Sequence, residues 1–238
     1  MASFRLTQDS GIESGFFKDI VVIIPALDEI ATIGHVVRDI KRNISCNVVV
    51  VDDGSRDGTG EAALRAGAVV LPHTVRTGAW GAIRTGFRYA DKHGYRMAVT
   101  MDGDGQHLSS DIHAIINPVA SGAADVAIGA CPLRASVARQ LAWLCLRKLS
   151  GLDIADLTSG FRAYNREAYS MLSSSETALL DYQDMGVLML LRNKGFTITE
   201  INVTMCPRAS GHSRIFSSWV AVFRYLLLTI ILCLAKIK

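Results

Sequence analysis

The sequence predicts an α/β domain in which a mostly parallel sheet is covered by helices on both faces. Short, continuously apolar runs recur through the first part of the chain, and segments with helical spacing separate them. Continuously apolar strands are typical of such sheets, because neither face of the strand meets water. The chain has 238 residues, of which 50% are hydrophobic, so it is long enough to bury one substantial core.

Four strands and the helices between them can be placed in order. The expected strands are residues 19–25, 47–53, 69–71 and 95–100. Apolar residues at helical spacing predict a first helix with a basic last turn. Its apolar positions are Ile30, Ile33, Val36, Val37 and Ile40. A second helix is expected through residues 62–64, and a third from Gly78 to Tyr89.

Acidic residues follow three of these strands, as Asp28 and Glu29, Asp52 and Asp53, and Asp102 and Asp104. A single acid of this kind is ordinary helix capping, which we expect for Asp57. Three acidic strand ends indicate a ligand site, because open α/β sheets bind ligands at the carboxyl ends of their strands. Neither a Gly-x-Gly-x-x-Gly motif after the first strand nor a Walker A loop is present. A nucleotide would therefore be held by carboxylates and a metal ion.

The central motif is Met-Asp-Gly-Asp-Gly-Gln-His at residues 101–107. Asp102 and Asp104, with the amide oxygen of Gln106, offer the oxygen ligands that Mg²⁺ prefers, and substrate phosphates often complete such a shell. The alternative is a polar turn, since Asp-Gly pairs are common in turns.

Composition excludes several classes of protein. The net charge is only +3, so nucleic acid is not an expected partner. The five cysteines are scattered without a Cys-x-x-Cys spacing, which favours reduced thiols in a cytosolic chain. The first residues contain no apolar stretch, and we interpret them as a flexible tail rather than a signal peptide.

The motifs at residues 22–29, 50–55 and 102–107 together resemble glycosyltransferase family 2, which has the GT-A fold. Two later blocks, at residues 156–164 and 207–214, resemble those of dolichyl- and polyprenyl-phosphate sugar synthases. The resemblance implies that Pro25, Ala26, Asp28 and Glu29 line the nucleoside pocket, with Asp53 near the base. It also implies that Asp102, Asp104 and Gln106 hold Mg²⁺ or Mn²⁺ against the donor diphosphate. A further acidic residue of the family corresponds to Asp181 or Asp184, and the sequence does not choose between them.

The acceptor decides which other residues the reaction needs. A lipid phosphate is largely ionised at pH 7 and needs cations rather than a base, whereas a sugar hydroxyl must be deprotonated. Arginines bind phosphate in a bidentate manner. The candidates for the acceptor phosphate are Arg134, Arg208 and Arg214. Asp104, Asp156 and Arg162 are the catalytic candidates, and Asp156 either acts as a base or orients Arg162.

We expect three segments: a flexible tail over residues 1–17, a GT-A domain over residues 18–216 and a membrane-interface helix over residues 217–238. The apolar run at 219–235 has 17 residues and contains Arg224, whereas a transmembrane helix needs about 20 apolar residues. We therefore expect a helix that lies in the interface on the cytoplasmic face of the membrane. The alternative is a core helix. A partner membrane protein or a homo-oligomer is compatible with this arrangement.

The expected activity is inverting transfer of one sugar from a GDP- or UDP-linked donor to a polyprenyl phosphate. A glycosyltransferase that extends a cell-envelope glycan on a sugar hydroxyl is the alternative enzyme. A catalytically silent membrane adaptor is the alternative from another class.

Overall fold

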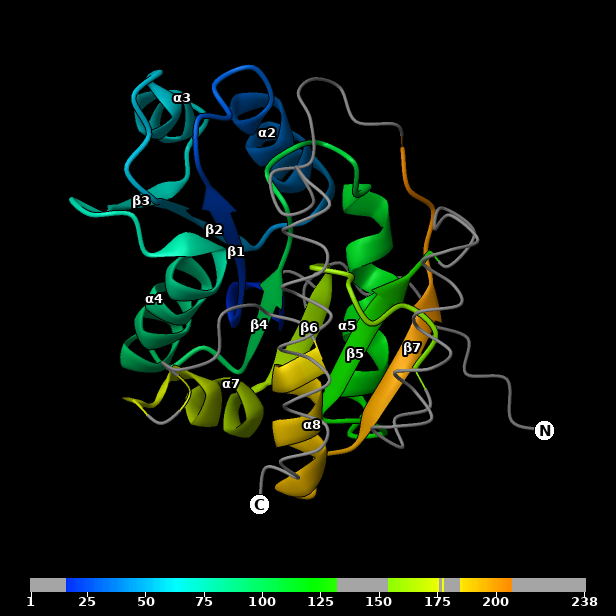
Figure 1. The fold of residues 1–238 in the computed structure, drawn as a ribbon. Coiled ribbons are helices and arrows are strands. Elements are labelled where there is room, and N and C mark those ends of the chain that lie inside the picture. The colour runs from blue at the N-terminus through cyan, green and yellow to red at the C-terminus, as the bar shows by residue number, and fades with distance from the viewer. Residues whose placement is uncertain (1–15, 132–153, 176, 178–184, 207–238) are drawn as a thin grey trace, which may run out of the picture.

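The computed structural model describes residues 16–131, 154–175, 177 and 185–206. Within these residues one seven-stranded sheet has the strand order β3-β2-β1-β4-β6-β5-β7 (Figure 1). The strands are β1 Ile20–Ala26, β2 Asn47–Asp52, β3 Val69–Pro72, β4 Met97–Thr100, β5 Val126–Ala130, β6 Arg162–Asn165 and β7 Ile198–Asn202. The first four correspond to the four strands that the sequence predicts.

Most neighbouring strands run in the same direction, as expected. β1, β2, β3 and β4 are mutually parallel, and β5 is parallel to β7. β6 is antiparallel to both of its neighbours, β4 and β5. As a result the first residue of β6, Arg162, pairs with the last residue of β4, Thr100. The loop that precedes β6 therefore reaches the edge of the sheet where the parallel strands end, which we call the carboxyl edge.

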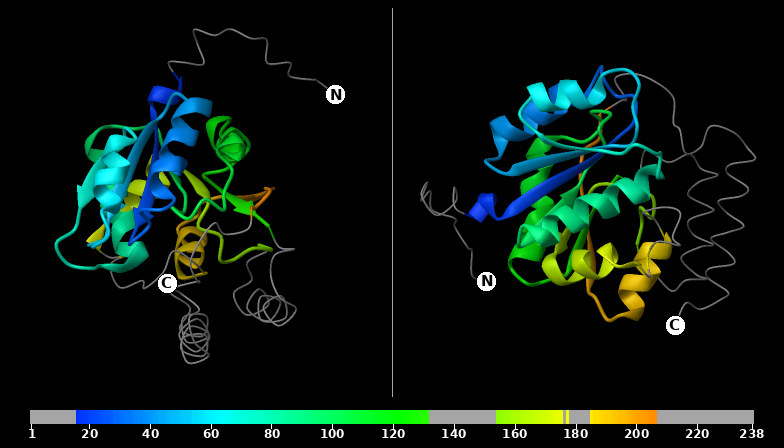
Figure 2. Two further views of the ribbon diagram at one scale, coloured as in Figure 1. Left: turned by 90° about the horizontal axis from the view of Figure 1, so that it is seen from above. Right: turned by 90° about the vertical axis from the view of Figure 1, so that its left-hand side faces the viewer.

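Helices cover both faces of the sheet (Figure 2). One face carries α2 Ile33–Asn43, α3 Thr59–Arg65 and α5 Ile112–Ala120, and a short 3₁₀ turn, η1 Ser109–Asp111, precedes α5. The other face carries α4 Gly78–Lys92, α7 Arg166–Ser173 and α8 Met185–Asn193. Alternate residues of β1 enter the two cores, with Val22 among the first group of helices and Val21 among the second. This burial on both sides explains why the strands are continuously apolar.

The first helix begins later than the sequence predicts. α2 starts at Ile33, and Ile30 lies outside it with 47% of its surface exposed. Side chains from the β2–α3 connection hold the preceding turn instead: the Ile30 N–H donates to Asp57 (3.1 Å), and the Glu29 N–H donates to Thr59 (2.7 Å). The expectation that Ile30 belongs to the helix is wrong, because Ile30 lies in the turn before α2, in which the Glu29 carbonyl accepts the N–H groups of Thr32 and Ile33.

No helix among the described residues is long and apolar enough to cross a membrane. The helix expected over residues 219–235 lies outside the described residues, as do Arg134, Arg208, Arg214, Asp181 and Asp184.

Candidate active site at the carboxyl edge of the sheet

The acidic residues that the sequence singles out meet at the carboxyl edge. The connections after β1, β2 and β4 leave the sheet there because these strands are parallel neighbours. The loop before β6 joins them because that strand is antiparallel. The described candidates gathered by this topology are Pro25, Ala26, Asp28, Glu29, Asp53, Asp102, Asp104, Gln106, Asp156 and Arg162.

The turn after β1 is tied to the turn after β2. Asp28 has a left-handed backbone (φ 47°), an unusual conformation for a residue other than glycine. Its N–H donates to the Ser55 hydroxyl (2.9 Å), and its carboxylate accepts the N–H of Arg56 (2.9 Å). The same carboxylate lies 3.4 Å from a guanidinium nitrogen of Arg76. These contacts hold a half-exposed acid at the rim of the edge.

Pro25 and Ala26 form the end of β1, where they pair with Val51 and Asp52. The Ala26 carbonyl accepts the N–H of Asp53 (2.8 Å), so the two strand ends remain together one residue beyond the sheet. The structure places these residues beside one another, and their contact with a nucleoside stays a prediction.

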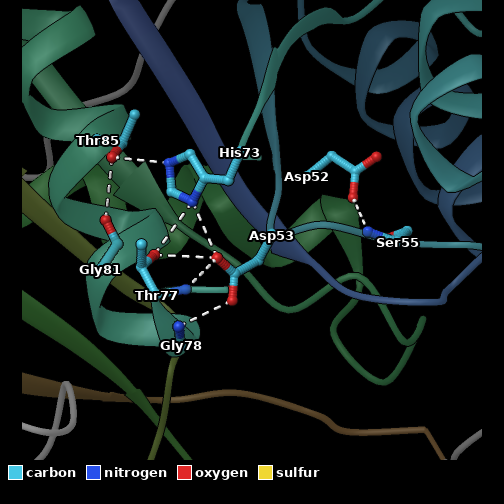
Figure 3. Close-up of polar contacts among 8 residues, drawn as sticks. All are labelled: Asp52, Asp53, Ser55, His73, Thr77, Gly78, Gly81 and Thr85. Atoms are coloured by element: carbon cyan, nitrogen blue, oxygen red, sulfur yellow. Dashed lines mark hydrogen bonds and ion pairs between the residues drawn. The ribbon is translucent and has the colours of Figure 1, made fainter. Parts of the chain in front are cut away.

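Asp53 is buried and accepts several hydrogen bonds at the start of α4 (Figure 3). One carboxylate oxygen accepts from the Thr77 N–H (2.7 Å), the Thr77 hydroxyl (2.9 Å) and His73 Nδ1 (2.9 Å). The other oxygen accepts the Gly78 N–H (2.8 Å). The opposite ring nitrogen of His73 lies 3.0 Å from the Thr85 hydroxyl. Asp53 thus joins β2 to the amino end of α4. Its expected position near the nucleobase of the donor stays a prediction.

This network predicts a pH-dependent contribution to stability. Burial raises the pKa of Asp53, but hydrogen bonds from Thr77, His73 and Gly78 outweigh it, so that the pKa lies below its ordinary value. The folded protein therefore gains stability above the ordinary pKa of about 3.9 and loses it as the pH falls through the lowered value.

We expect Asp53→Asn to lower the free energy of unfolding by about 2 kcal/mol at pH 7, because it removes the charge and turns an amide group toward the backbone donors. The difference from wild type should narrow as the pH falls from 5 to 3. Urea unfolding at a series of pH values measures both effects, with Asp91→Asn as a control at an exposed ion pair with Arg166. A difference in the free energy of unfolding that stays constant over this pH range would show that the charge of Asp53 does not contribute to stability.

The central motif presents one half-exposed carboxylate and one buried carboxylate. The Asp102 side chain is 49% exposed, whereas Asp104 is buried and accepts the Gln106 N–H (3.0 Å). Cys206, after β7, donates its N–H to the Gln106 carbonyl (2.8 Å) and accepts from the Gln106 amide nitrogen (3.4 Å). Because that contact uses the amide nitrogen, the amide oxygen is the atom of Gln106 suited to act as a metal ligand.

The loop before β6 lies against Asp102. The Thr100 hydroxyl donates to the Gly160 carbonyl (2.7 Å), which fixes the loop beside the end of β4. A Cβ atom at Gly160 would lie 2.8 Å from one carboxylate oxygen of Asp102 and 3.1 Å from the other. Only glycine leaves room for the carboxylate in this position.

This arrangement fits a hard divalent cation that takes its remaining ligands from a substrate. No group of three or more His, Cys, Asp or Glu side chains suited to a metal occurs in the described part of the chain. The two carboxylates and the Gln106 amide oxygen would supply part of an oxygen shell, and Mg²⁺ is commonly bound by one or two carboxylates together with substrate phosphates. The donor set therefore suits a cation that arrives with a diphosphate.

Asp156 is fully buried in the loop before β6. Its carboxylate accepts the N–H and the hydroxyl of Thr158 (both 3.2 Å) and the N–H of Cys131 (3.3 Å). Glu200, on β7, accepts the backbone N–H groups of Ala155 and Asp156 (2.7 and 2.8 Å). Residue spacing does not single out Glu200, although an acid within a strand that pairs with a buried strand is a usable signal for a buried acceptor.

The guanidinium of Arg162 is also fully buried. Its Nε donates to the Ser159 carbonyl (2.8 Å), and Nη2 donates to the Leu157 carbonyl (3.2 Å). In the structure Arg162 therefore holds the backbone of the loop that carries Gly160. Its role in the reaction, like that of Asp156, stays a prediction.

Comparisons with known proteins agree with this architecture. The family model described as "Glycosyl transferase family 2" matches residues 21–172. A polyprenol monophosphomannose synthase of Mycolicibacterium smegmatis is 30% identical over 216 residues, covering 83% of this chain and 81% of that protein. A UDP-N-acetylglucosamine–dolichyl-phosphate N-acetylglucosaminyltransferase of Methanococcus voltae is 26% identical over 213 residues, covering 78% and 85%. Among solved structures, glucosyl-3-phosphoglycerate synthase from Mycobacterium tuberculosis in complex with Mn²⁺, UDP and phosphoglyceric acid superimposes with a TM-score of 0.69 at 19% identity, covering 99% and 84%.

The mostly parallel sheet, with its strand-end carboxylates gathered at one edge, has the GT-A fold of enzymes that use nucleotide-diphosphate sugars. The chain belongs to glycosyltransferase family 2, and within that family it is similar to polyprenyl-phosphate sugar synthases.

Proposed function

We propose that this glycosyltransferase moves a single sugar from a GDP- or UDP-linked donor to a polyprenyl phosphate at the membrane surface, with inversion at the anomeric carbon. The observation that carries the proposal is the placement of Asp102, Asp104 and Gln106 in one connection at the carboxyl edge, where the Asp102 carboxylate is half-exposed and Gln106 contacts Cys206 through its amide nitrogen. The names of two relatives support a lipid phosphate as acceptor, and the Mn²⁺ and UDP in the solved structure support the donor and the metal.

Different residues of the chain would bind the metal ion and the nucleoside of the donor. Asp102, Asp104 and Gln106 would hold Mg²⁺ or Mn²⁺. A bound cation supplies a Lewis acid that neutralises the charge growing on the diphosphate as it leaves. Asp28 and Glu29 would line the nucleoside end of the pocket, beside Pro25 and Ala26 at the end of β1. Asp53 supports this end by holding the amino end of α4 in place.

The acceptor half favours a phosphate over a hydroxyl. An acceptor oxygen must form a bond to the anomeric carbon while the bond from that carbon to the donor diphosphate breaks, which inverts the configuration. A lipid phosphate needs no base at pH 7, since its second pKa is about 6. The buried Asp156 carboxylate already accepts hydrogen bonds from Thr158 and Cys131, which suits a supporting role better than that of a base exposed to a hydroxyl. Arg134, Arg208 and Arg214 are the cations proposed for the phosphate.

The membrane association that such an acceptor requires is assigned to residues 217–238. A helix lying in the cytoplasmic interface would bring the basic residues at 207–214 to headgroup depth, so the enzyme would act as a peripheral protein on the inner face. A partner membrane protein or a second copy could share this task.

A panel of nucleotide sugars tests the proposal. We expect the full chain with Mn²⁺ to convert undecaprenyl or dolichyl phosphate into a lipid-linked monosaccharide, detected as one added hexose or N-acetylhexosamine by mass spectrometry. The rate should level off above about pH 6, since the acceptor's second ionisation is the one that matters. Transfer to a free sugar hydroxyl would favour the glycan-extending alternative if the wild-type rate rises with pH and Asp156→Asn abolishes this rise. A protein that neither transfers the sugar nor hydrolyses the donor would favour the silent adaptor.

A further inference from the structure

His107 has a buried imidazole whose nitrogen atoms lack hydrogen bonds. It ends the central motif, and only 1% of its side-chain surface is exposed. Within the described structure neither Nδ1 nor Nε2 has a hydrogen-bond partner. Buried polar atoms in native proteins are nearly always hydrogen-bonded, so an imidazole kept in this state calls for a functional explanation.

The surroundings of His107 hold the ring in one place. It packs against Phe161 with ring centroids 4.9 Å apart and an interplanar angle of 35°. Its backbone forms an antiparallel bridge with Met205, beyond the end of β7. These contacts place Nε2 3.4 Å from a carboxylate oxygen of Asp102, which is within ion-pair distance but outside hydrogen-bond geometry.

Gly160 and His107 both lie against the Asp102 carboxylate. Gly160 approaches both of its oxygens so closely that no Cβ fits. His107 approaches one oxygen through Nε2. Gly160 and Phe161 are adjacent in the chain, so the loop before β6 touches the carboxylate through one residue and packs on the imidazole through the next. Together they restrict how the carboxylate can turn.

We propose that His107 is a positioning residue for Asp102: once the divalent cation is bound, its Nε2–H donates to the carboxylate and fixes the orientation in which Asp102 meets the cation. The inference rests on the metal site of the proposed function and adds a residue to it. Carboxylate ligands are usually oriented by hydrogen bonds of this kind, and losing the orienting partner typically weakens metal binding 10- to 100-fold. The ring of His107 supplies the donor, and Phe161 supplies the surface that keeps it in place.

Two substitutions separate hydrogen bonding from packing. His107→Phe keeps a ring against Phe161 and removes the donor, whereas His107→Gln removes the ring and keeps an N–H donor at a similar reach. We expect Mn²⁺ affinity in the presence of UDP or GDP, measured by electron paramagnetic resonance titration, to fall about 10- to 100-fold in His107→Phe. His107→Gln should recover a large part of the loss. Urea unfolding of both variants shows whether the fold survives.

His113 offers a matched control. Its ring also contacts a phenylalanine, Phe17, with centroids 4.9 Å apart, but Phe17 lies before the start of β1 rather than at the carboxyl edge. His113→Phe and His113→Gln should leave Mn²⁺ affinity unchanged.

Four results would overturn the inference, and they differ from one another. Weaker Mn²⁺ binding in His107→Gln than in His107→Phe would assign the ring a packing role only. A directly bound imidazole nitrogen, seen by electron spin echo measurements on the Mn²⁺-loaded wild type, would make His107 a ligand instead. Wild-type protein that binds no Mn²⁺ with either nucleotide would overturn the proposed metal site as well, whereas binding that His107→Phe leaves unchanged would overturn the role of His107 alone.

Discussion

Asp104→Asn is expected to reduce sugar transfer by on the order of a thousandfold or more while the protein stays folded. Asp104 is buried beside the half-exposed Asp102, and its carboxylate accepts the Gln106 N–H. An asparagine has nearly the same shape, and its amide oxygen can keep that hydrogen bond. The substitution therefore removes one negative charge from the proposed metal shell and keeps the shape of the side chain. Initial rates with saturating donor, together with urea unfolding, measure the two effects separately.

A surface carboxylate provides the comparison for Asp104. Asp91 lies 3.5 Å from Arg166 in an exposed ion pair, and such pairs contribute only about 0–1 kcal/mol to stability. Asp91→Asn should thus transfer sugar at the wild-type rate. Full wild-type activity after EDTA treatment would contradict the metal assignment, whatever the result of Asp104→Asn.

Gly160→Ala is expected to lower kcat/KM about 100-fold through its effect on Asp102. The new methyl group would meet one oxygen of that carboxylate at 2.8 Å, so either the carboxylate turns away or the loop before β6 moves. A displacement of about 1 Å in a group that is proposed to hold the cation is enough for such a loss. Steady-state kinetics should show this loss of kcat/KM, and Mn²⁺ titration should show weaker binding in the variant than in the wild type.

Two comparisons make the Gly160 experiment specific. Gly34→Ala introduces the same methyl group on α2, where the nearest atom is the end of the flexible Arg38 side chain at 3.4 Å, and it should be nearly neutral. In an Asp102→Ala background, Gly160→Ala should cost little further activity, because the group it displaces is already gone. An undiminished effect of Gly160→Ala in that background would show that it acts through some other contact.

The first half of the sheet could be predicted from sequence because its signals are local. The apolar runs expected at 19–25, 47–53 and 95–100 correspond to β1, β2 and β4 with bounds that differ by one or two residues, and their acidic ends lie at one edge because the strands are parallel. The position of Ile30 could not be predicted in the same way. Its spacing fits a helix, but Ile30 lies in the turn before α2, where its N–H donates to Asp57, 27 residues away in the chain.

The second half of the site depends on the direction of one strand. The sequence identifies Gly160 and Arg162 as part of a motif, but nothing in a four-residue run of polar and apolar residues states that β6 is antiparallel. Only that direction brings Gly160 against Asp102. Likewise, an arginine in a motif suggests a phosphate ligand, whereas the structure shows its guanidinium bonded to the carbonyls of Leu157 and Ser159. Burial of a charged group is a property of the folded chain that residue spacing does not reveal.

The insertion of β6 between β4 and β5 also has a consequence for folding order. The contact between Thr100 and Gly160 joins residues 60 positions apart in the chain, and pairings of such long range form slowly because a large loop must close first. Until β6 is in place, β4 and β5 each present an unpaired edge, and such edges are prone to associate with other chains. A nascent chain that has emerged only as far as β5 would contain the entire central motif but lack the loop that confines Asp102. The capacity to bind the donor with its cation should consequently appear in one late step of folding, together with closure of the sheet.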